Sequence, residues 1–400
     1  MLSVEEALER ILRDVSPLPS ETVSIAQAAG RALAEDAVSR VTQPPADVSA
    51  MDGYALRAED TAVIPARLRL VGSAPAGGAE GMAVGPGEAV RIFTGGPLPD
   101  GADAIVIQED TREEGAEVIV GEAAEAGQFV RRAGLDFRAG DLGIAAGQLL
   151  TARDIGLAAA MNIPWLKVRR RPRVAILATG DEIVMPGEPI GPNQIVSSNA
   201  LALSAMIESC GGEAVNLGIA RDDAASLSAI SQGAEGSDLF VTTGGASVGE
   251  RDLVRQVLGD RGLELDFWKI AMRPGKPLMF GRLGRTAMLG LPGNPVSSLV
   301  CALLFLRPLL DRLMGLNRPA HPVEQAILGA GLPANDRRQD YLRARLRRDG
   351  PGPATVTAYQ RQDSSMLATL AHSDCLIVRP PFAPEIAAGA AVDILPLKSI

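Results

Sequence analysis

The chain contains few residues suited to chemistry by histidine or cysteine. It has two histidines and three cysteines in 400 residues, and no cysteines stand in a CxxC spacing. The scarcity of histidine disfavours zinc catalysis by a histidine cluster. Widely separated cysteines fit a reducing cytoplasm better than a disulfide framework. We therefore expect Cys210, Cys301 and Cys375 to be small, buried apolar residues.

Long apolar runs, aromatic residues and excess positive charge are also lacking. The longest apolar stretch, residues 299–306, is too short to span a bilayer, and early acidic residues argue against a signal peptide. Aromatics make up 3% of the chain, so the cores should consist of Leu, Val, Ile and Ala. The formal net charge of -9 argues against general binding to nucleic acid or to an anionic membrane. These features predict a cytoplasmic protein.

The chain is longer than one hydrophobic core usually organises. Changes in hydrophobic pattern and in the frequency of glycine and proline divide it into four parts. Its N-terminal part begins with the capping-box pattern Ser3-x-x-Glu6, which predicts a helix. The expected fold is multidomain α/β plus β, with a doubly wound, mostly parallel central domain. The expected parts are a helical linker domain (1–40 and 142–172), a β-rich inserted domain (41–141), the α/β domain (173–316) and a small C-terminal β domain (317–400).

Five hydrophobic runs in the α/β part each end in a polar turn. Alternation of such runs with helical segments predicts a parallel sheet. The turns after parallel strands lie at one edge of the sheet, where ligands bind. We therefore predict one composite site built from several loops. The five turns begin at Thr179, Arg221, Gly244, Arg273 and Pro292.

The turn that begins at Gly244 is rich in glycine. Gly244, Gly245 and Gly249 can present backbone N–H groups to an anion. The spacing is neither the GxGxxG dinucleotide fingerprint nor a Walker A loop. A purely structural corner remains the alternative.

Four carboxylates follow strand ends: Asp181, Glu182, Asp222 and Asp252. Carboxylates gathered without histidine suit a hard cation such as Mg²⁺. The alternative is that some of them cap helices, as Asp252 could.

The fourth turn carries closely spaced cations. Lys269, Arg273 and Lys276 lie in a segment stiffened by Pro274 and Pro277, which suits phosphate or another oxyanion. A solvated basic loop is the alternative. A second basic cluster surrounds Arg343, and most of its members are expected at the surface.

Six ordered motifs resemble those of the molybdopterin molybdenumtransferases, the molybdenum insertases of molybdenum cofactor synthesis, which are related to the E domain of gephyrin. The first three are Ser49-Ala-Met-Asp-Gly-Tyr-Ala, Thr94-Gly-Gly-Pro-Leu-Pro and Thr179-Gly-Asp-Glu. The others are Gly244-Gly-Ala-Ser-Val-Gly-Glu-Arg-Asp252, Arg273-Pro-Gly-Lys-Pro and Leu291-Pro-Gly-Asn-Pro-Val-Ser297.

The resemblance implies an elongated homodimer with a molybdopterin-binding α/β domain. It implies transfer of molybdenum from molybdate to adenylylated molybdopterin, with release of AMP and assistance from Mg²⁺. It also suggests transient contact with the molybdopterin adenylyltransferase, and a position for the residues near Asp52 against the α/β domain of the other subunit.

Carried over position by position, the resemblance implies two sets of functional residues. The catalytic positions are Asp52, Asp136, Glu182, Asp222, Asp252, Lys269 and Lys276, of which Glu182, Asp222 and Asp252 would hold the metal. The substrate-binding positions are Thr94, Thr179, Gly180, Asp181, Gly244, Gly245, Ser247, Gly249, Arg273, Pro277, Pro292, Gly293, Asn294, Ser297, Arg343 and Ser364. Within these, molybdate would lie among Lys276, Pro277, Ser297, Arg343 and Ser364.

Two departures from the family pattern stand at the expected oxyanion pocket. Arg273 replaces a common lysine, and Asp363 stands before Ser364 where glycine is frequent. Two other functions remain open from the sequence. One is adenylyl transfer to molybdopterin, which the two β domains disfavour. The other is a non-catalytic scaffold, as in gephyrin, which the retained acids and lysines disfavour.

Overall fold

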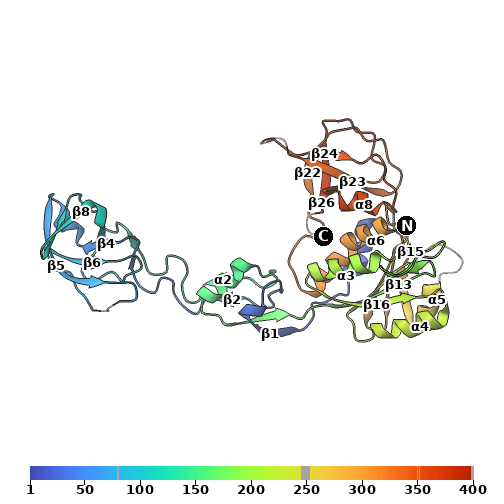
Figure 1. Cartoon of the computed structure of the whole chain (residues 1–400), viewed down its shortest axis with the longest axis horizontal. Coiled ribbons are helices and arrows are strands. Elements are labelled where there is room, and N and C mark those ends of the chain that lie inside the picture. The colour runs from blue at the N-terminus through green and yellow to red at the C-terminus, as the bar shows by residue number, and fades with distance from the viewer. Residues whose placement is uncertain (79–80, 245–252, 349, 351, 398–400) are drawn as a thin grey trace.

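A computed structural model of the chain describes residues 1–78, 81–244, 253–348, 350 and 352–397. The protomer is elongated (Figure 1). A β-rich module lies at one end, a small module lies in the middle, and the α/β domain lies with the C-terminal β domain at the other end. This arrangement confirms the expected multidomain α/β plus β fold.

The α/β domain is built on a six-stranded sheet in the order β16-β13-β17-β21-β20-β18. Strands β16, β13, β17 and β21 pair in parallel, whereas β20 is antiparallel to both of its neighbours. Strand β18 therefore runs in the same direction as the four parallel strands. Four of the five predicted runs end as strands at one edge, whereas the fourth, which was predicted to extend from Leu265 to Met272, leaves the sheet after β18 and reaches a strand of the C-terminal sheet. The bounds are β13 Arg173–Thr179, β16 Glu213–Ala220, β17 Leu239–Thr243, β18 Leu263–Phe267, β20 Met279–Leu283 and β21 Thr286–Leu291.

Helices cover both faces of this sheet. Val174 and Ile176 on β13 point into one core with α3 and α6, whereas Ala175 and Leu177 point into the other with α4 and α5. This alternation follows from the period of two along a strand, and a strand buried on both faces reads as a continuous apolar run. The helices are α3 Asn199–Ser209, α4 Ala224–Ser231, α5 Leu253–Asp260, α6 Pro295–Cys301, a π-helical segment Ala302–Leu306 and α7 Arg307–Leu313.

The structure differs from the expected helical linker domain in two respects. Helix α1 (Val4–Leu12) has the predicted capping box, but its apolar face (Val4, Ala7 and Ile11) packs into the α/β core beside α7. The rest of the linker is partly β structure, because the β-branched Thr22 and Val23 lie in a strand that pairs with β12. The bounds are β1 Ser20–Ser24, β2 Ala37–Val38, β11 Leu142–Ile144, α2 Ala152–Ala160 and β12 Trp165–Arg169.

The inserted module is a six-stranded sheet in the order β7-β4-β6-β5-β9-β8. Its core is small and aliphatic, with Leu56, Leu68 and Val118 among its buried residues. The bounds are β4 Gly53–Leu56, β5 Ala66–Ala74, β6 Glu88–Ile92, β7 Ala104–Ile107, β8 Thr111–Glu114 and β9 Glu117–Val120, with β3 Val48–Ser49 paired to β10 Val130–Arg131 at its base.

The C-terminal domain is a small closed barrel, because β25 pairs with both β23 and β26. Its sheet also includes a strand from the α/β domain, β19 (Met272–Arg273), which pairs in parallel with β23. The two domains are therefore joined by backbone hydrogen bonds at the predicted cationic turn. The bounds are β22 Glu324–Leu328, β23 Gln339–Arg347, β24 Thr355–Ala358, α8 Leu367–Ala371, β25 Cys375–Arg379 and β26 Ala391–Pro396.

Two predictions from composition can be compared directly with the structure. Cys210, Cys301 and Cys375 are all buried and unpaired, as expected. Within the described residues, every helix is too short or too polar to cross a bilayer.

Candidate functional site

A large hollow lies at the strand-end edge of the α/β sheet. It has a volume of about 1240 Å³ and is lined by residues that follow β13, β16, β17 and β21. A cleft of this size can hold a nucleotide-linked ligand, since pockets for small molecules span about 300–1,000 Å³. Of the predicted site residues, ten line it: Thr179, Gly180, Glu182, Asp222, Gly244, Pro277, Pro292, Gly293, Asn294 and Ser297.

The floor of the cleft is formed by a close approach of two strand ends. A Cβ atom on Gly244 would lie 2.5 Å from the backbone oxygen of Thr179, and Gly244 has a φ of +90°. Only glycine fits these two requirements. The Oγ1 atom of Thr179 is buried and has no hydrogen-bond partner among the described residues. An unpartnered buried hydroxyl is uncommon, and this one lies directly beneath the glycine turn of the cleft.

The carboxylates at the cleft come from two neighbouring turns. Glu182 and Asp222 both line the cleft and are exposed. Asp181 accepts a hydrogen bond from the backbone N–H of Asp222 at 3.1 Å and so fixes the two turns together. The described residues contain no group of three metal-binding side chains, but the predicted third metal ligand, Asp252, lies outside them.

Asn199 links three of the loops that form the cleft. Its Nδ2 atom donates hydrogen bonds to Oγ1 of Thr243 at 2.9 Å and to the backbone oxygen of Gly293 at 2.7 Å. Helix α3 begins at Asn199 itself, and the Asn199 side chain bridges the ends of β17 and β21. This role depends on long-range contacts that sequence spacing does not reveal.

The cationic loop carries two differently placed charges. Arg273 forms a bidentate ion pair with Asp340 of β23, with Nε–Oδ1 and Nη2–Oδ2 distances of 3.0 and 2.7 Å. This pairing raises the pKa of the Arg273 guanidinium. Lys276 is exposed, and no carboxylate pairs with it within the part of the chain that the structure describes. Lys269 lies with its Nζ atom 4.4 Å from the ring centroid of Trp268.

The C-terminal domain supplies the remaining cationic residue of the predicted oxyanion pocket. Arg343 is 1% exposed, and its guanidinium donates to Gln362 Oε1 and to the backbone oxygen of Met366. Burial lowers the pKa of this guanidinium. The arginine is therefore held rigidly by its own domain.

Ser364 lies where the C-terminal domain meets the α/β domain. Its Oγ atom accepts a hydrogen bond from Asn294 Nδ2 at 2.9 Å. Asp363, the departure beside it, accepts from the N–H and the hydroxyl of Ser365, and these bonds lower the pKa of its carboxyl. Ser365 itself lines the cleft.

Three predicted residues lie away from the cleft. Asp136 precedes Phe137 of the middle core, whereas Asp52 and Thr94 lie in the inserted module. Asp52 accepts from both the N–H and the hydroxyl of Thr94, at 2.7 and 2.8 Å, and these bonds lower its pKa. Asp136 is exposed, and its N–H donates to the backbone oxygen of Gln43. Within one protomer, the inserted module stands at the far end from the cleft (Figure 1).

Four predicted positions, Gly245, Ser247, Gly249 and Asp252, lie outside the described residues. The cleft also includes residues that were not predicted. Arg221 follows β16 directly, and Ile183 and Ile195 come from the short pair β14 (Ile183–Val184) and β15 (Ile195–Val196). The position of Arg221 after a parallel strand was a signal that could have identified it.

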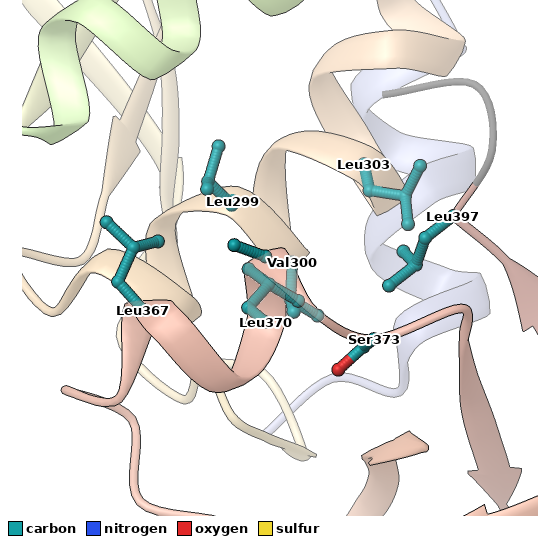
Figure 2. A pocket seen from close by; sticks show the side chains of 8 residues that line it. Leu299, Val300, Leu303, Leu367, Leu370, Ser373 and Leu397 are labelled. Atoms are coloured by element: carbon teal, nitrogen blue, oxygen red, sulfur yellow. The ribbon is translucent and has the colours of Figure 1, made fainter. Parts of the chain in front are cut away.

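A second hollow of about 200 Å³ lies between α6 and α8. Figure 2 shows that its walls are leucine and valine side chains, including Leu299, Leu303, Leu370 and Leu397, with Ser373 as a polar group at its edge. A ligand site normally combines apolar walls with several convergent polar groups, and this hollow lacks them among the described residues. The cleft at the sheet edge is therefore the candidate site.

Comparison with known proteins identifies relatives over the whole chain. The MoeA N-terminal region (domain I and II) matches residues 2–162, the probable molybdopterin binding domain matches residues 175–312, and the MoeA C-terminal region (domain IV) matches residues 325–397. Molybdopterin molybdenumtransferase 2 of Mycobacterium tuberculosis is 37% identical over 98% of this chain and 99% of its own length. The chain belongs to the molybdopterin molybdenumtransferase family. This confirms the resemblance seen in the six motifs.

Other members of the family agree with this assignment in sequence and in fold. The molybdopterin molybdenumtransferase of a Nostoc species is 36% identical, over 99% of this chain and 94% of its own. A crystal structure of the molybdopterin biosynthesis MoeA protein of Pyrococcus horikoshii superimposes with a TM-score of 0.83 at 33% identity and covers 100% of this chain and 99% of its own. The relatives in this molybdenumtransferase family are transferases by name, and the fold is that of the MoeA proteins.

Proposed function

We propose that this chain transfers molybdenum from molybdate to adenylylated molybdopterin, with release of AMP. The observation that carries the proposal is the cleft at the strand-end edge, since it gathers glycine turns, carboxylates and the proline-stiffened loop of a molybdenumtransferase in one place. Its volume suits a nucleotide joined to a pterin.

In this proposal the two substrates occupy neighbouring places: the pterin lies in the cleft, and molybdate lies at its border with the C-terminal domain. The adenylylated pterin lies over the turns that contain Thr179, Gly180 and Gly244, where backbone N–H groups can meet its phosphates. Molybdate would lie beside Ser297 and Ser364, which the bonds from Val296 N–H and Asn294 to Ser364 bring together, and Lys276 and Arg343 would supply the positive charge. Fixed cations hold two mutually repelling anions at reacting distance, which lowers the entropic barrier.

The carboxylates fit a hard cation in their donor chemistry. Glu182 and Asp222 present oxygen ligands at the cleft, which is the set that Mg²⁺ prefers. These two residues, with Asp252, would hold the ion. A magnesium ion there would offset the charge of the phosphate oxygens as the adenylate leaves.

The distance of Asp52 from the cleft supports a homodimer. In this proposal the paired Asp52 and Thr94 of one subunit complete the cleft of the other. The hydrogen bonds from Thr94 keep Asp52 ionised. A transient contact with the molybdopterin adenylyltransferase would deliver the substrate in the cytoplasm.

Reconstitution tests the proposal directly. The purified chain is mixed with adenylylated molybdopterin, molybdate and Mg²⁺, and AMP release and activation of an apo-molybdoenzyme are measured. We expect both signals from wild type and at least a hundredfold loss of rate in Glu182→Gln and Asp222→Asn, since electrostatic groups contribute about 10²–10³-fold each. Glu188→Gln is the matched control. Glu188 is an exposed carboxylate near the same turn, and it accepts a local hydrogen bond from the N–H of Met185.

Two results would contradict this function. Accumulation of adenylylated pterin from ATP and molybdopterin without molybdate would identify an adenylyltransferase. Equilibrium binding of molybdate with no AMP release under any condition would identify a scaffold.

A further inference from the structure

The loop that carries Lys276 is fixed on both sides. On one side Gly275 packs directly on α6: a Cβ there would lie 2.4 Å from the Cys301 Sγ atom. On the other side Arg273 forms its bidentate pair with Asp340 of the C-terminal domain. Lys276 follows both anchors directly, its backbone oxygen accepts a hydrogen bond from the N–H of Ile270 at 3.1 Å, and its side chain remains exposed. The position of its ammonium therefore depends on both.

In the Arg273–Asp340 pair, the accepting carboxylate of Asp340 is buried and the donating guanidinium of Arg273 is half-exposed. The Asp340 side chain is 4% exposed, and both of its ion-pair contacts come from Arg273. The same two residues face each other in the backbone ladder between β19 and β23. Two parallel N–H···O bonds add directional specificity that a single lysine contact lacks.

Strand β23 connects this pair to the expected oxyanion ligand. Arg343 lies three residues after Asp340 on the same strand, about 10 Å along it at ~3.3 Å per residue. Gln362 and Met366 hold the Arg343 guanidinium within its domain. The relative position of Lys276 and Arg343 is therefore set by how the 273–277 loop is attached to β23.

We propose that Arg273 is a positioning residue: through its bidentate pair with Asp340 it sets the spacing between Lys276 and Arg343 and does not itself bind the oxyanion. The charge of Arg273 is satisfied by Asp340, so Lys276 is the cation that this loop offers to an anion. This inference rests on the proposed function, since it assumes that molybdate binds between the two domains.

The opposite effects expected of two variants distinguish positioning from direct binding. If Arg273 positions the loop, then Arg273→Gln and Asp340→Asn both weaken binding of molybdate, because each breaks the pair. If Arg273 binds molybdate, then Asp340→Asn releases its guanidinium and strengthens binding. We expect the dissociation constant of molybdate to rise about tenfold in each variant, which is the loss of about 1.4 kcal/mol of binding free energy when Lys276 no longer stands at its distance from Arg343.

Binding of molybdate alone to the full-length chain is measured by calorimetry, and KM and kcat are measured in the reconstituted reaction. KM for molybdate should rise in both variants with kcat within about threefold of wild type. The double variant R273Q/D340N, in which the two amides can bond to each other, should recover part of the affinity. Arg273→Lys, which keeps the charge and the fold, should lie between wild type and Arg273→Gln.

Arg170→Gln is the matched control. Arg170 also forms a bidentate pair, with Asp238, but Asp238 precedes β17 and so lies at the opposite end of the strand from the cleft. We expect this control to lower the melting temperature and leave the affinity for molybdate unchanged.

Several outcomes overturn the inference. Tighter binding in Asp340→Asn identifies Arg273 as a ligand, and a lowered melting temperature with unchanged affinity in both variants identifies a purely structural pair. Wild-type affinity in Arg273→Lys shows that the bidentate geometry is not needed. If wild type binds molybdate but releases no AMP, the proposed function fails, whereas the calorimetric comparison still tests the positioning role.

Discussion

Asn199→Ala would remove the side chain that joins three loops of the cleft. The variant loses two hydrogen bonds, to Thr243 Oγ1 and to the Gly293 backbone oxygen. At about 0.5–1.5 kcal/mol net for each bond, the free energy of unfolding should fall by roughly 1–3 kcal/mol. Because Asn199 is half-buried, water can reach the freed carbonyl, so we expect the lower half of this range.

The effect on activity should exceed the effect on stability. The turns after β17 and β21 carry Gly244 and Gly293, which line the cleft, and without Asn199 they can move apart. We expect kcat/KM for adenylylated molybdopterin to fall by about ten- to a hundredfold, since loss of alignment by about 1 Å has an effect of this order. Thermal denaturation and initial rates of AMP release measure the two effects separately.

Asn216→Ala is the control for this variant. Asn216 is exposed on β16, and its Oδ1 atom accepts one local hydrogen bond from the N–H of Gly218. The free energy of unfolding of Asn216→Ala should fall by about as much for its one lost hydrogen bond as that of Asn199→Ala does for each of its two, and its activity should equal that of wild type. The reasoning is refuted if Asn199→Ala is destabilised but keeps kcat/KM within about twofold of wild type.

Three further substitutions test separate parts of the structure. Gly244→Ala should lower the free energy of unfolding by at least about 2 kcal/mol and abolish AMP release, because the new Cβ would lie 2.5 Å from the Thr179 backbone oxygen and the residue has a left-handed φ. Gly259→Ala is the control in the same denaturation assay; it has open space around it on α5 and should raise the free energy of unfolding by up to ~1 kcal/mol. Ile11→Ala should lower the free energy of unfolding by about 2–5 kcal/mol, because Ile11 is fully buried in the α/β core, whereas exposed Glu9→Ala should have little effect; equal effects would show that α1 is not docked there. Burial lowers the pKa of His321 below its ordinary 6.5, so the unfolded chain binds the proton more readily; the free energy of unfolding should be highest above pH 6.5 and fall as the pH drops below it. In His321→Gln, the melting temperature should lack this fall between pH 7.5 and 5.5. Parallel pH profiles for the two proteins would contradict the assignment.

The sequence predicted the parts of the fold that depend on local pattern. The runs that became β13, β17 and β21 were identified because strands buried on both faces contain almost no polar residues, and the turns after them and after β16 do lie at one edge. The turn predicted after the fourth run instead begins in β19, beside β23. The capping box at Ser3 and Glu6 was identified because its two hydrogen bonds join residues only three positions apart in the sequence.

The features that escaped prediction depend on contacts between distant residues. Strand β20 was missed because its run continues directly from the Pro277 turn, and its antiparallel direction is set by pairing and not by composition. The docking of α1 on α7 joins residues about 300 positions apart, and the Arg273–Asp340 pair joins two domains. Nothing in the local spacing of these residues identifies their partners.

The docking of α1 has a consequence for synthesis of the chain. Its apolar face, with Val4, Ala7 and Ile11, leaves the ribosome long before α7, which follows only after about 300 more residues. At roughly 5–20 residues per second, that stripe is without its native partner for about 15–60 s. During this interval the nascent helix is a natural binding target for a chaperone that recognises exposed apolar surface, and faster translation of the inserted module would shorten its exposure.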